Sequence, residues 1–345
     1  WRDRQPWLQE RGYALRPRYR PTWVPSWRDT GKFWVNCEDS LTVVLPHLLD
    51  ATRISDGTMV LLKKISLSKH PHEIEINKFF SSEPLSSSER NHCVPLYEVL
   101  DVPEDGDTKL LVMPFLRQYN NPQIATVGEA AEFFRQIFEG LQFMHEHRVA
   151  HRDCMSENIM MDPKPLYPKM FHPVLQTYNR DRTGRAKHYT RTKRPVKYYF
   201  IDFGISRRYT EGEDSSRELL ILGADRSIPE FVKYRKTECD PFPTDVYYLG
   251  NLIQKEFLER THGVEFMRPL VTDMLQDDPA HRPTIHQVVE RFNEIRKGLS
   301  NRQLRSKLVD LENDIIHIPW VDLRHMFRKL YYILFRYPAL PTVRS

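Results

Sequence analysis

The sequence predicts an α+β fold, in which a small β-rich part precedes a larger and mainly helical part. Two strand-like runs, 41–49 and 59–65, flank the turn signal Ser-Asp-Gly at 55–57. Further along the chain, apolar residues within 130–147 recur at the spacing of one helix face. Strands early in a chain and helices later are typical of the α+β class.

Length and composition agree with a globular protein of moderate charge. The chain has 345 residues, which is room for a two-lobed fold at roughly 150 residues per domain. A hydrophobic content of 40% and a charged content of 28% are ordinary for such proteins. The formal charge of +5 is modest and does not indicate nucleic acid as a partner. No apolar run reaches the length of about 18 residues that a membrane span needs, so no transmembrane segment is expected.

The cysteines have no paired spacing. Their positions, Cys37, Cys93, Cys154 and Cys239, predict neither a zinc site nor a disulfide framework. This pattern favours a reducing compartment, and we expect a cytoplasmic or nuclear protein. The sequence begins at Trp1 rather than Met, which leaves room for an upstream segment or a removed signal. The oligomeric state is left open.

Residues 151–162, which read HRDCMSENIMMD, are the most informative stretch. Asp153 and Asn158 are five positions apart, whereas partners on one helix face are three or four apart. We therefore expect a loop that directs several polar groups toward one point. Asp202 follows an apolar, strand-like run and precedes Phe203 and the permissive Gly204. A lone carboxylate in this position suits a metal ligand at the end of a strand.

These residues resemble two motifs of the eukaryotic protein kinases. The triplet His-Arg-Asp at 151–153, with Asn158 five positions after the Asp, resembles the catalytic loop, and Asp-Phe-Gly at 202–204 resembles the metal-binding motif. The resemblance extends over roughly residues 40–298. Within it, the amino-acid sequence is most similar to protein-kinase-like proteins of fungi. As in protein kinases, the His-Arg-Asp motif precedes the Asp-Phe-Gly motif in this chain.

The resemblance implies a two-lobed protein kinase-like fold, with a small β-rich N-lobe and a large, mainly helical C-lobe. Five segments are then expected: a Trp/Pro/Arg-rich extension at 1–40, an N-lobe at about 41–116, a C-lobe at about 117–298, a basic insertion at about 163–197 within it, and a helical tail at 299–345.

The resemblance also implies the residues that would hold the ATP phosphates. Val-Leu-Leu-Lys at 60–63 resembles the strand that carries the phosphate-contacting lysine, which makes Lys63 that residue. Lys64 would lie on the opposite face of the strand. Glu73 matches the glutamate that pairs with this lysine, and Glu75 is the competing choice. The alternative is that both lysines are solvated edge charges.

Further roles follow from the same resemblance. Met113 would be the gatekeeper, and Pro114 to Leu116 the hinge that receives adenine. Asn158 and Asp202 would hold Mg²⁺, and Asp153 would accept the proton of the acceptor hydroxyl. The implied cofactors are ATP and Mg²⁺, and the implied partner is a protein substrate of unknown identity.

Two departures from the kinase pattern stand out. Residues 41–51 contain no glycine, although kinases cover the phosphates with a glycine-rich loop just before the Lys-bearing strand. Met155 stands two positions after Asp153, where serine/threonine kinases have a lysine. The substrate class is therefore open, although Glu157-Asn158 is closer to the serine/threonine form.

Residues 1–36 hold five of the six tryptophans, together with four prolines and many arginines. Prolines at this density exclude long helices. We expect an extended arm that buries its aromatic side chains over the small lobe. A docking surface for a partner is the alternative.

The insertion is basic. Its second half, 179–197, has eight Lys or Arg and one Asp. We expect a mobile, solvated loop in which residues 176–194 lie outside the core. The alternative is a patch for an anionic partner or a nuclear-import receptor.

Several residues of the C-terminal half are expected to have structural roles. Residues 205–228 resemble an activation segment, and Asp245 is expected to brace the catalytic loop. Glu230 is expected to form a buried ion pair with Arg282. The stretch 321–338 has near-helical spacing, and it would pack on the large lobe, lie on a membrane surface or dimerise.

Three functions remain open. The first is an ATP-dependent protein kinase, with a serine/threonine acceptor favoured and an atypical nucleotide loop. The second is a pseudokinase, which uses the same fold as a binding scaffold. The third is a small-molecule phosphotransferase.

Overall fold

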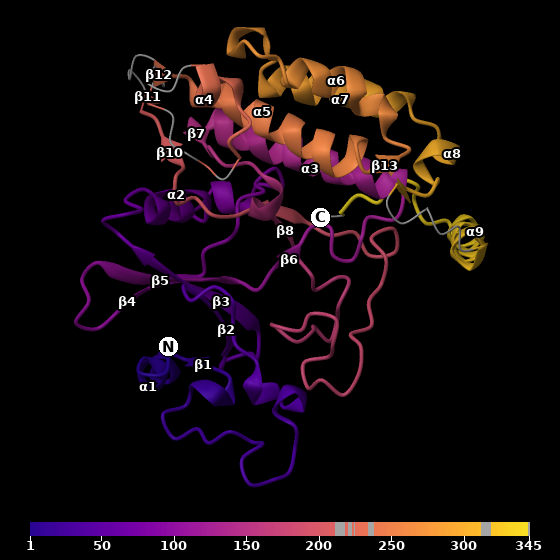
Figure 1. Ribbon diagram of the computed structural model, residues 1–345. Coiled ribbons are helices and arrows are strands. Elements are labelled where there is room, and N and C mark those ends of the chain that lie inside the picture. Colours follow the sequence, from indigo (N-terminus) through magenta and orange to yellow (C-terminus); the bar gives the residue numbers. More distant parts are fainter. Residues whose placement is uncertain (211–217, 220–222, 224, 234–237, 312–318, 344–345) are drawn as a thin grey trace. The chain divides into compact units, whose positions relative to one another are not determined.

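Five strands form one antiparallel sheet in the computed structural model (Figure 1), in the order β1-β2-β3-β5-β4. The strands and the helix that belongs with them are α1 (Gln5–Glu10), β1 (Tyr13–Ala14), β2 (Leu48–Arg53), β3 (Met59–Ser66), β4 (Glu98–Asp101) and β5 (Thr108–Pro114). They belong to a smaller compact unit made of Trp1–Pro71, Val94–Leu116 and Asp162–Tyr189.

The second compact unit is mainly helical and comprises His72–Cys93, Arg117–Met161 and Thr190–Ser345. Its helices are α2 (Glu73–Phe80), α3 (Val127–Glu146), α4 (Pro229–Lys233), α5 (Pro241–Ile253), α6 (Arg268–Met274), α7 (Ile285–Gly298), α8 (Asn301–Leu304) and α9 (Pro319–Leu334). Short strands complete it: β6 (Arg117–Gln118), β7 (Val149–Ala150), β8 (Ile159–Met161), β9 (Tyr198–Phe200), β10 (Arg207–Arg208), β11 (Glu218–Leu219), β12 (Glu238–Cys239), β13 (Thr261–His262) and β14 (Val309–Asp310). A β-rich unit and a helical unit confirm the predicted α+β class.

The structure describes residues 1–210, 218–219, 223, 225–233, 238–311 and 319–343. The activation-segment-like stretch predicted at 205–228 therefore lies partly outside the described residues.

The N-terminal arm supplies an edge strand and part of the core of the smaller unit. Tyr13 and Ala14 pair with Arg53 and Thr52 of β2. One face of the sheet is apolar, and arm residues join it: the buried cluster contains Leu8, Tyr13, Leu15, Leu49, Ala51, Val60, Leu62, Leu100, Val102, Leu110 and Val112. The arm thus covers part of the sheet with Leu8, Tyr13 and Leu15, as expected. The expected burial of its tryptophans is not seen, because none of the five is buried and Trp34 is 57% exposed.

The first predicted strand was wrong in position. Residues 41–47 are not a strand, and β2 begins at Leu48. Pro46 has no N–H to donate to a ladder, which disfavours a central strand there. The predicted turn at 55–57 is present: Gly57 has a φ of 70° and the Asp56 carboxylate accepts a hydrogen bond from the Thr58 N–H at 3.0 Å. The second run, 59–65, is β3.

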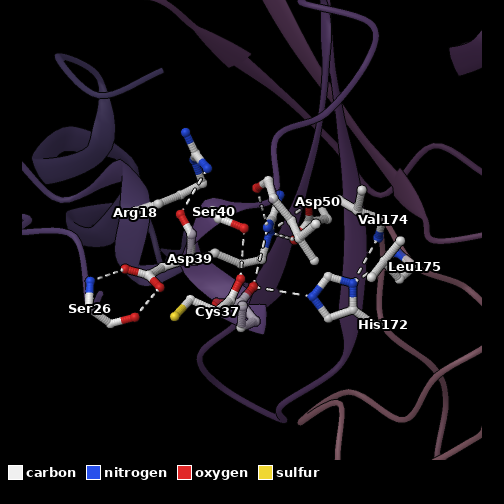
Figure 2. Close-up of polar contacts among 12 residues, drawn as sticks. Arg18, Ser26, Cys37, Asp39, Ser40, Asp50, His172, Val174 and Leu175 are labelled. Carbon is white, nitrogen blue, oxygen red and sulfur yellow. Dashed lines mark hydrogen bonds and ion pairs between the residues drawn. The ribbon is translucent and has the colours of Figure 1, made fainter. Parts of the chain in front are cut away.

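The rest of the arm is held by polar contacts rather than by regular structure (Figure 2). The buried Asp39 carboxylate accepts a hydrogen bond from the Ser26 N–H at 2.8 Å. It also accepts one from the Trp23 indole at 2.9 Å. Arg18 donates to the Asp39 carbonyl at 2.8 Å. These contacts fold 16–40 back on itself although prolines exclude a long helix there.

Helix α3 is the centre of the larger unit and confirms the helix predicted at 130–147. The Thr126 hydroxyl accepts a hydrogen bond from the Glu129 N–H at 3.1 Å, which caps its first turn. Phe138 on α3 packs edge-on against Phe292 of α7. Helix α2 belongs to this unit, and its Phe80 packs against Phe143 and His147.

The end of the insertion is not the solvated loop that its composition predicts, although most of 177–189 is exposed. Arg191 and Thr192 are 3% and 4% exposed. Three carbonyl groups surround the Arg191 guanidinium, which donates to Tyr119, Pro122 and Gln123 at 2.6, 2.7 and 3.1 Å. A buried cation is tolerated here because these acceptors replace water. The basic side chains of Arg185 and Lys187 are exposed, so an anionic partner or import receptor at this tip stays a prediction.

Earlier parts of the insertion also pack, within the smaller unit. Phe171 is buried and its ring lies 6.0 Å from that of Phe115. Arg180 donates to the Thr52 hydroxyl at 3.3 Å, and Arg182 to the Val35 carbonyl at 3.4 Å. The insertion thus contacts both the arm and β2.

Candidate active site

Lys63 lies on the face of the sheet opposite the apolar cluster. In β3, Val60 and Leu62 belong to that cluster, so Leu61 and Lys63 point to the other face. Residues directly opposite across a ladder share a face. Lys63 is opposite Leu48 and Leu111, and Leu61 is opposite Asp50 and Met113. Lys63 and Met113 therefore share one face, and their roles as the phosphate-contacting lysine and the gatekeeper stay predictions.

The residues predicted to form the hinge, 114–116, come directly after Met113 in the chain. Met113 is buried, whereas Pro114 and Leu116 are partly exposed at the end of β5. Pro114 ends the strand opposite Val60.

A carboxylate cluster that the sequence did not predict lies on this same face (Figure 2). Arg16 Nε donates to Asp50 Oδ2 at 2.9 Å, and Arg16 Nη1 donates to Glu38 Oε1 at 3.2 Å. His172 from the insertion bonds Glu38 Oε1 through Nε2 at 3.2 Å. The imidazole Nδ1 accepts from the N–H groups of Val174 and Leu175, so Nε2 is the donor to Glu38.

The cluster shifts the pKa values of its two carboxyl groups in opposite directions. The hydrogen bond from His172 is the main cause that lowers the pKa of Glu38, and Arg16 adds to it. Burial raises the pKa of Asp50, although Arg16 opposes this effect. Beside the cluster is a cavity of about 320 Å³, lined by residues of the arm, β2, β3 and the insertion. The connection between β1 and β2 is residues 15–47, which contain one glycine, Gly31.

The catalytic-loop-like stretch is braced from behind by Asp245, as predicted. The Asp245 carboxylate accepts hydrogen bonds from the N–H groups of His151 and Arg152 at 2.8 and 2.6 Å. Arg152 has a φ of 71°, which a non-glycine residue adopts only when its surroundings hold it. His145 Nε2 also contacts the Asp245 carboxylate, at 3.1 Å.

Asp153 and Asn158 are brought together. Asn158 Nδ2 donates to Asp153 Oδ2 at 2.8 Å and to the Asp153 carbonyl at 3.0 Å. Because its amide nitrogen is used in this way, the side-chain oxygen of Asn158 is the atom left for a cation.

Asp202 is tied to the same loop through the backbone. The Ile201 N–H donates to the Asn158 carbonyl at 3.0 Å, and Ile159 is opposite Phe200 in the β8–β9 pair. Asp202 is exposed and has a φ of 63°, an uncommon conformation that clusters at functional sites. Its carboxylate accepts a hydrogen bond from the Gly204 N–H at 3.3 Å.

These donors fit Mg²⁺. A carboxylate and an amide oxygen are the hard ligands that this ion prefers. No cluster of three or more His, Cys, Asp or Glu side chains suited to a metal occurs in the parts of the chain that the structure describes. The assignment of Asn158 and Asp202 as Mg²⁺ ligands stays a prediction.

Glu73 begins α2 and is 1% exposed. It belongs to the larger unit, whereas Lys63 belongs to the smaller one. Their pairing stays a prediction.

The surroundings of Met155 contain groups that the sequence did not identify. A cavity of about 250 Å³ is lined by Met155 and by the acidic residues Glu157, Asp225 and Glu256, with Lys255 among them. A Cβ atom on Gly223 would lie 2.6 Å from Asp153 Oδ1, so a side chain at this position would push the carboxylate aside. The sequence around Gly223, Gly-Ala-Asp, matches no known motif, so this proximity to Asp153 could not be predicted from the sequence.

Comparisons with known proteins show which family the chain resembles. A model described as a protein kinase domain matches residues 47–262, more than half of the chain. The serine/threonine-protein kinase PLK4 of Drosophila virilis is 25% identical over 265 residues, which cover 75% of this chain and 30% of that protein. The human NUAK family SNF1-like kinase 2 is 32% identical over 117 residues, which cover 32% of this chain and 18% of that protein.

A fungal relative is also similar. The serine/threonine-protein kinase CAK1 of Saccharomyces cerevisiae is 27% identical over 175 residues, which cover 51% of this chain and 37% of that protein. The predicted similarity to fungal proteins has this weak support. The match spans about 30% of the length of the PLK4 relative.

Proposed function

Because this chain belongs to the protein kinase family, we propose that it transfers the γ-phosphate of ATP to a hydroxyl group of a protein, with serine or threonine as the favoured acceptor. The observation that carries the proposal is the set of hydrogen bonds that holds Asp153, Asn158 and Asp202 in one loop system. A scaffold has no chemical need for this set.

The residues would act by positioning and by neutralising charge, which phosphoryl transfer mainly requires. Bound Mg²⁺ would neutralise the charge on the phosphates, held by the Asn158 oxygen and the Asp202 carboxylate. Lys63 would contact the ATP phosphates and Glu73 would fix Lys63. Asp153 would accept a hydrogen bond from the acceptor hydroxyl and then take its proton.

The nucleotide would be covered by the arm in place of a glycine-rich loop. Residues 15–47 connect the first two strands of the sheet, and the Arg16–Asp50 pair lies on the Lys63 face. A charged pair offers an adenine ring less apolar surface than aliphatic side chains would, so we expect weak ATP binding.

The acceptor would approach along the cavity beside Met155. Three carboxylates and one lysine line this cavity with Met155. The relatives named as serine/threonine kinases support the same acceptor class here.

The second candidate function is a pseudokinase that binds partners without catalysis. It is favoured by Met155, which offers no cation beside the transferring phosphate, and by the buried Asp50 carboxylate on the Lys63 face.

A thermal-shift measurement with ATP and Mg²⁺, followed by phosphate transfer to a generic protein substrate, separates the two. We expect ATP with Mg²⁺ to raise the melting temperature of the wild type, and Asp202→Ala to abolish this rise while the protein stays folded. Glu290→Ala, an exposed acid on α7, is the matched control and should retain the rise. An unchanged shift in Asp202→Ala would reject the metal assignment.

A further inference from the structure

Helix α9 presents its apolar face to solvent. Along the helix, Leu323, Met326, Phe327, Leu330, Ile333 and Leu334 are 37%, 49%, 60%, 55%, 51% and 78% exposed. Their spacing of three and four residues puts all six on one stripe. A surface helix of a globular protein normally turns such a stripe toward the core.

The opposite face of α9 is the one that packs on the larger unit. Tyr332 is 6% exposed and its hydroxyl is hydrogen-bonded to that of Thr190. His325, Arg328, Lys329 and Tyr332 line one recess together with Thr126, Leu304 and Ala339. The polar side of α9 therefore packs on the larger unit, and the apolar stripe is exposed and available to contact another surface.

The charge around the stripe is positive. From the start of α9 at position 319 to position 343 the sequence has four basic residues, Arg324, Arg328, Lys329 and Arg336, and one acidic residue, Asp322. Lys193, from the end of the insertion, lies 5.9 Å from the ring centre of Tyr331. Arg336 is exposed just past the end of α9.

We propose that α9 is an interfacial helix that binds the surface of a bilayer containing anionic lipid. The stripe from Leu323 to Leu334 enters the boundary between headgroups and acyl chains, and Lys193 and Arg336 contact the headgroups. Apolar Phe and Leu side chains on one face, with Lys and Arg beside them, are the composition that such helices use. No helix among the described residues is long and apolar enough to cross a membrane, so α9 would lie in the plane of the surface.

A second copy of the chain fits this face less well. A symmetric contact between two copies would bring the same basic residues of each copy against one another, and like charges repel. The inference is independent of the proposed phosphotransfer, because its readout is binding.

The test is co-sedimentation of the full chain with phosphatidylcholine vesicles, with and without phosphatidylserine. We expect binding to the phosphatidylserine vesicles that weakens as salt is added. Phe327→Glu with Leu330→Glu should weaken it at least about tenfold, since two apolar side chains leave the bilayer. Val44→Glu, at an apolar position that is 90% exposed in the smaller unit, is the matched control and should bind normally.

A second variant tests the role of charge. Lys193→Gln with Arg336→Gln should lose the preference for phosphatidylserine. Melting of each variant shows that it is folded. Absence of binding to phosphatidylserine vesicles would overturn the proposal, as would equal binding by the Phe327→Glu/Leu330→Glu variant. A wild-type dimer in sedimentation velocity that this variant converts to monomer would assign the stripe to a second copy instead.

Discussion

Arg282 and Glu230 form a two-pronged ion pair that is closed to solvent. Arg282 Nη1 and Nη2 each lie 2.6 Å from one carboxylate oxygen of Glu230, and both side chains are 0% exposed. Arg282 Nε donates to the Gln276 carbonyl at 2.8 Å, and its guanidinium lies over the ring of Tyr247. This confirms the predicted brace and ties α4 to the segment before α7.

Arg282→Ala should destabilise the larger unit by about 3–5 kcal/mol, because Glu230 would remain buried without a counter-charge. Chemical denaturation measures this change in the free energy of unfolding. Arg291→Ala removes a similar pair, with Asp273 at 2.5 Å, in which both side chains are more than 40% exposed. That control should cost less than about 1 kcal/mol, and a similar loss in both variants would contradict the argument.

Met155→Lys should raise phosphate transfer about tenfold and hardly alter ATP affinity. Met155 lies two positions after Asp153, and a cation there would stabilise the charge that develops during transfer. The measurement is turnover with a generic protein substrate, beside Met155→Leu, which adds no charge. Asp153→Asn should be inactive in either background. If none of these proteins transfers phosphate and ATP causes no melting shift, the pseudokinase function is the better account.

Arg191→Ala should cost at least about 2 kcal/mol of folding stability. The substitution leaves the carbonyl groups of Tyr119, Pro122 and Gln123 without their charged donor. Lys187→Ala, at an exposed position in the same insertion, should stay within about 0.5 kcal/mol of the wild type. Urea unfolding compares the two, and equal stability would mean that water replaces the guanidinium.

Glu38→Gln should make the stability of the smaller unit less dependent on pH in acid. The His172 hydrogen bond lowers the pKa of Glu38 below its ordinary value of 4.5. A carboxyl group with a lowered pKa stabilises the folded state above the unfolded pKa, and this contribution is lost as pH falls through the folded pKa. The variant should therefore be less stable at neutral pH, and the difference should shrink below pH 4.5.

Urea unfolding at neutral and acid pH measures this effect. Glu290→Gln, an exposed substitution on α7, should follow the wild type at both pH values. A constant difference between Glu38→Gln and the wild type would exclude the titration of Glu38 as its cause.

Local sequence patterns were sufficient to predict structure where the hydrogen bonds of a segment lie within that segment. The apolar spacing of 130–147 predicted α3 because a helix satisfies its backbone groups within itself. The polar spacing from Asp153 to Asn158 predicted a loop, and the Asn158–Asp153 hydrogen bond lies within that loop. The contacts of Asp245 and Arg282 were predicted from the resemblance, because the residues at these motif positions contact the same partners in the family.

The sequence by itself thus determined the family, helix α3 and the loop that brings Asp153 and Asn158 together, whereas the role of Asp202 stays a prediction. Only the tertiary structure decided that Tyr13 and Ala14 complete the sheet, because a two-residue strand takes its hydrogen bonds from a partner far along the chain. It also decided that Arg191 is buried and that Asp50 shares a face with Lys63. Composition predicts solvent for a basic segment, but the carbonyl groups that hold Arg191 come from a separate part of the chain.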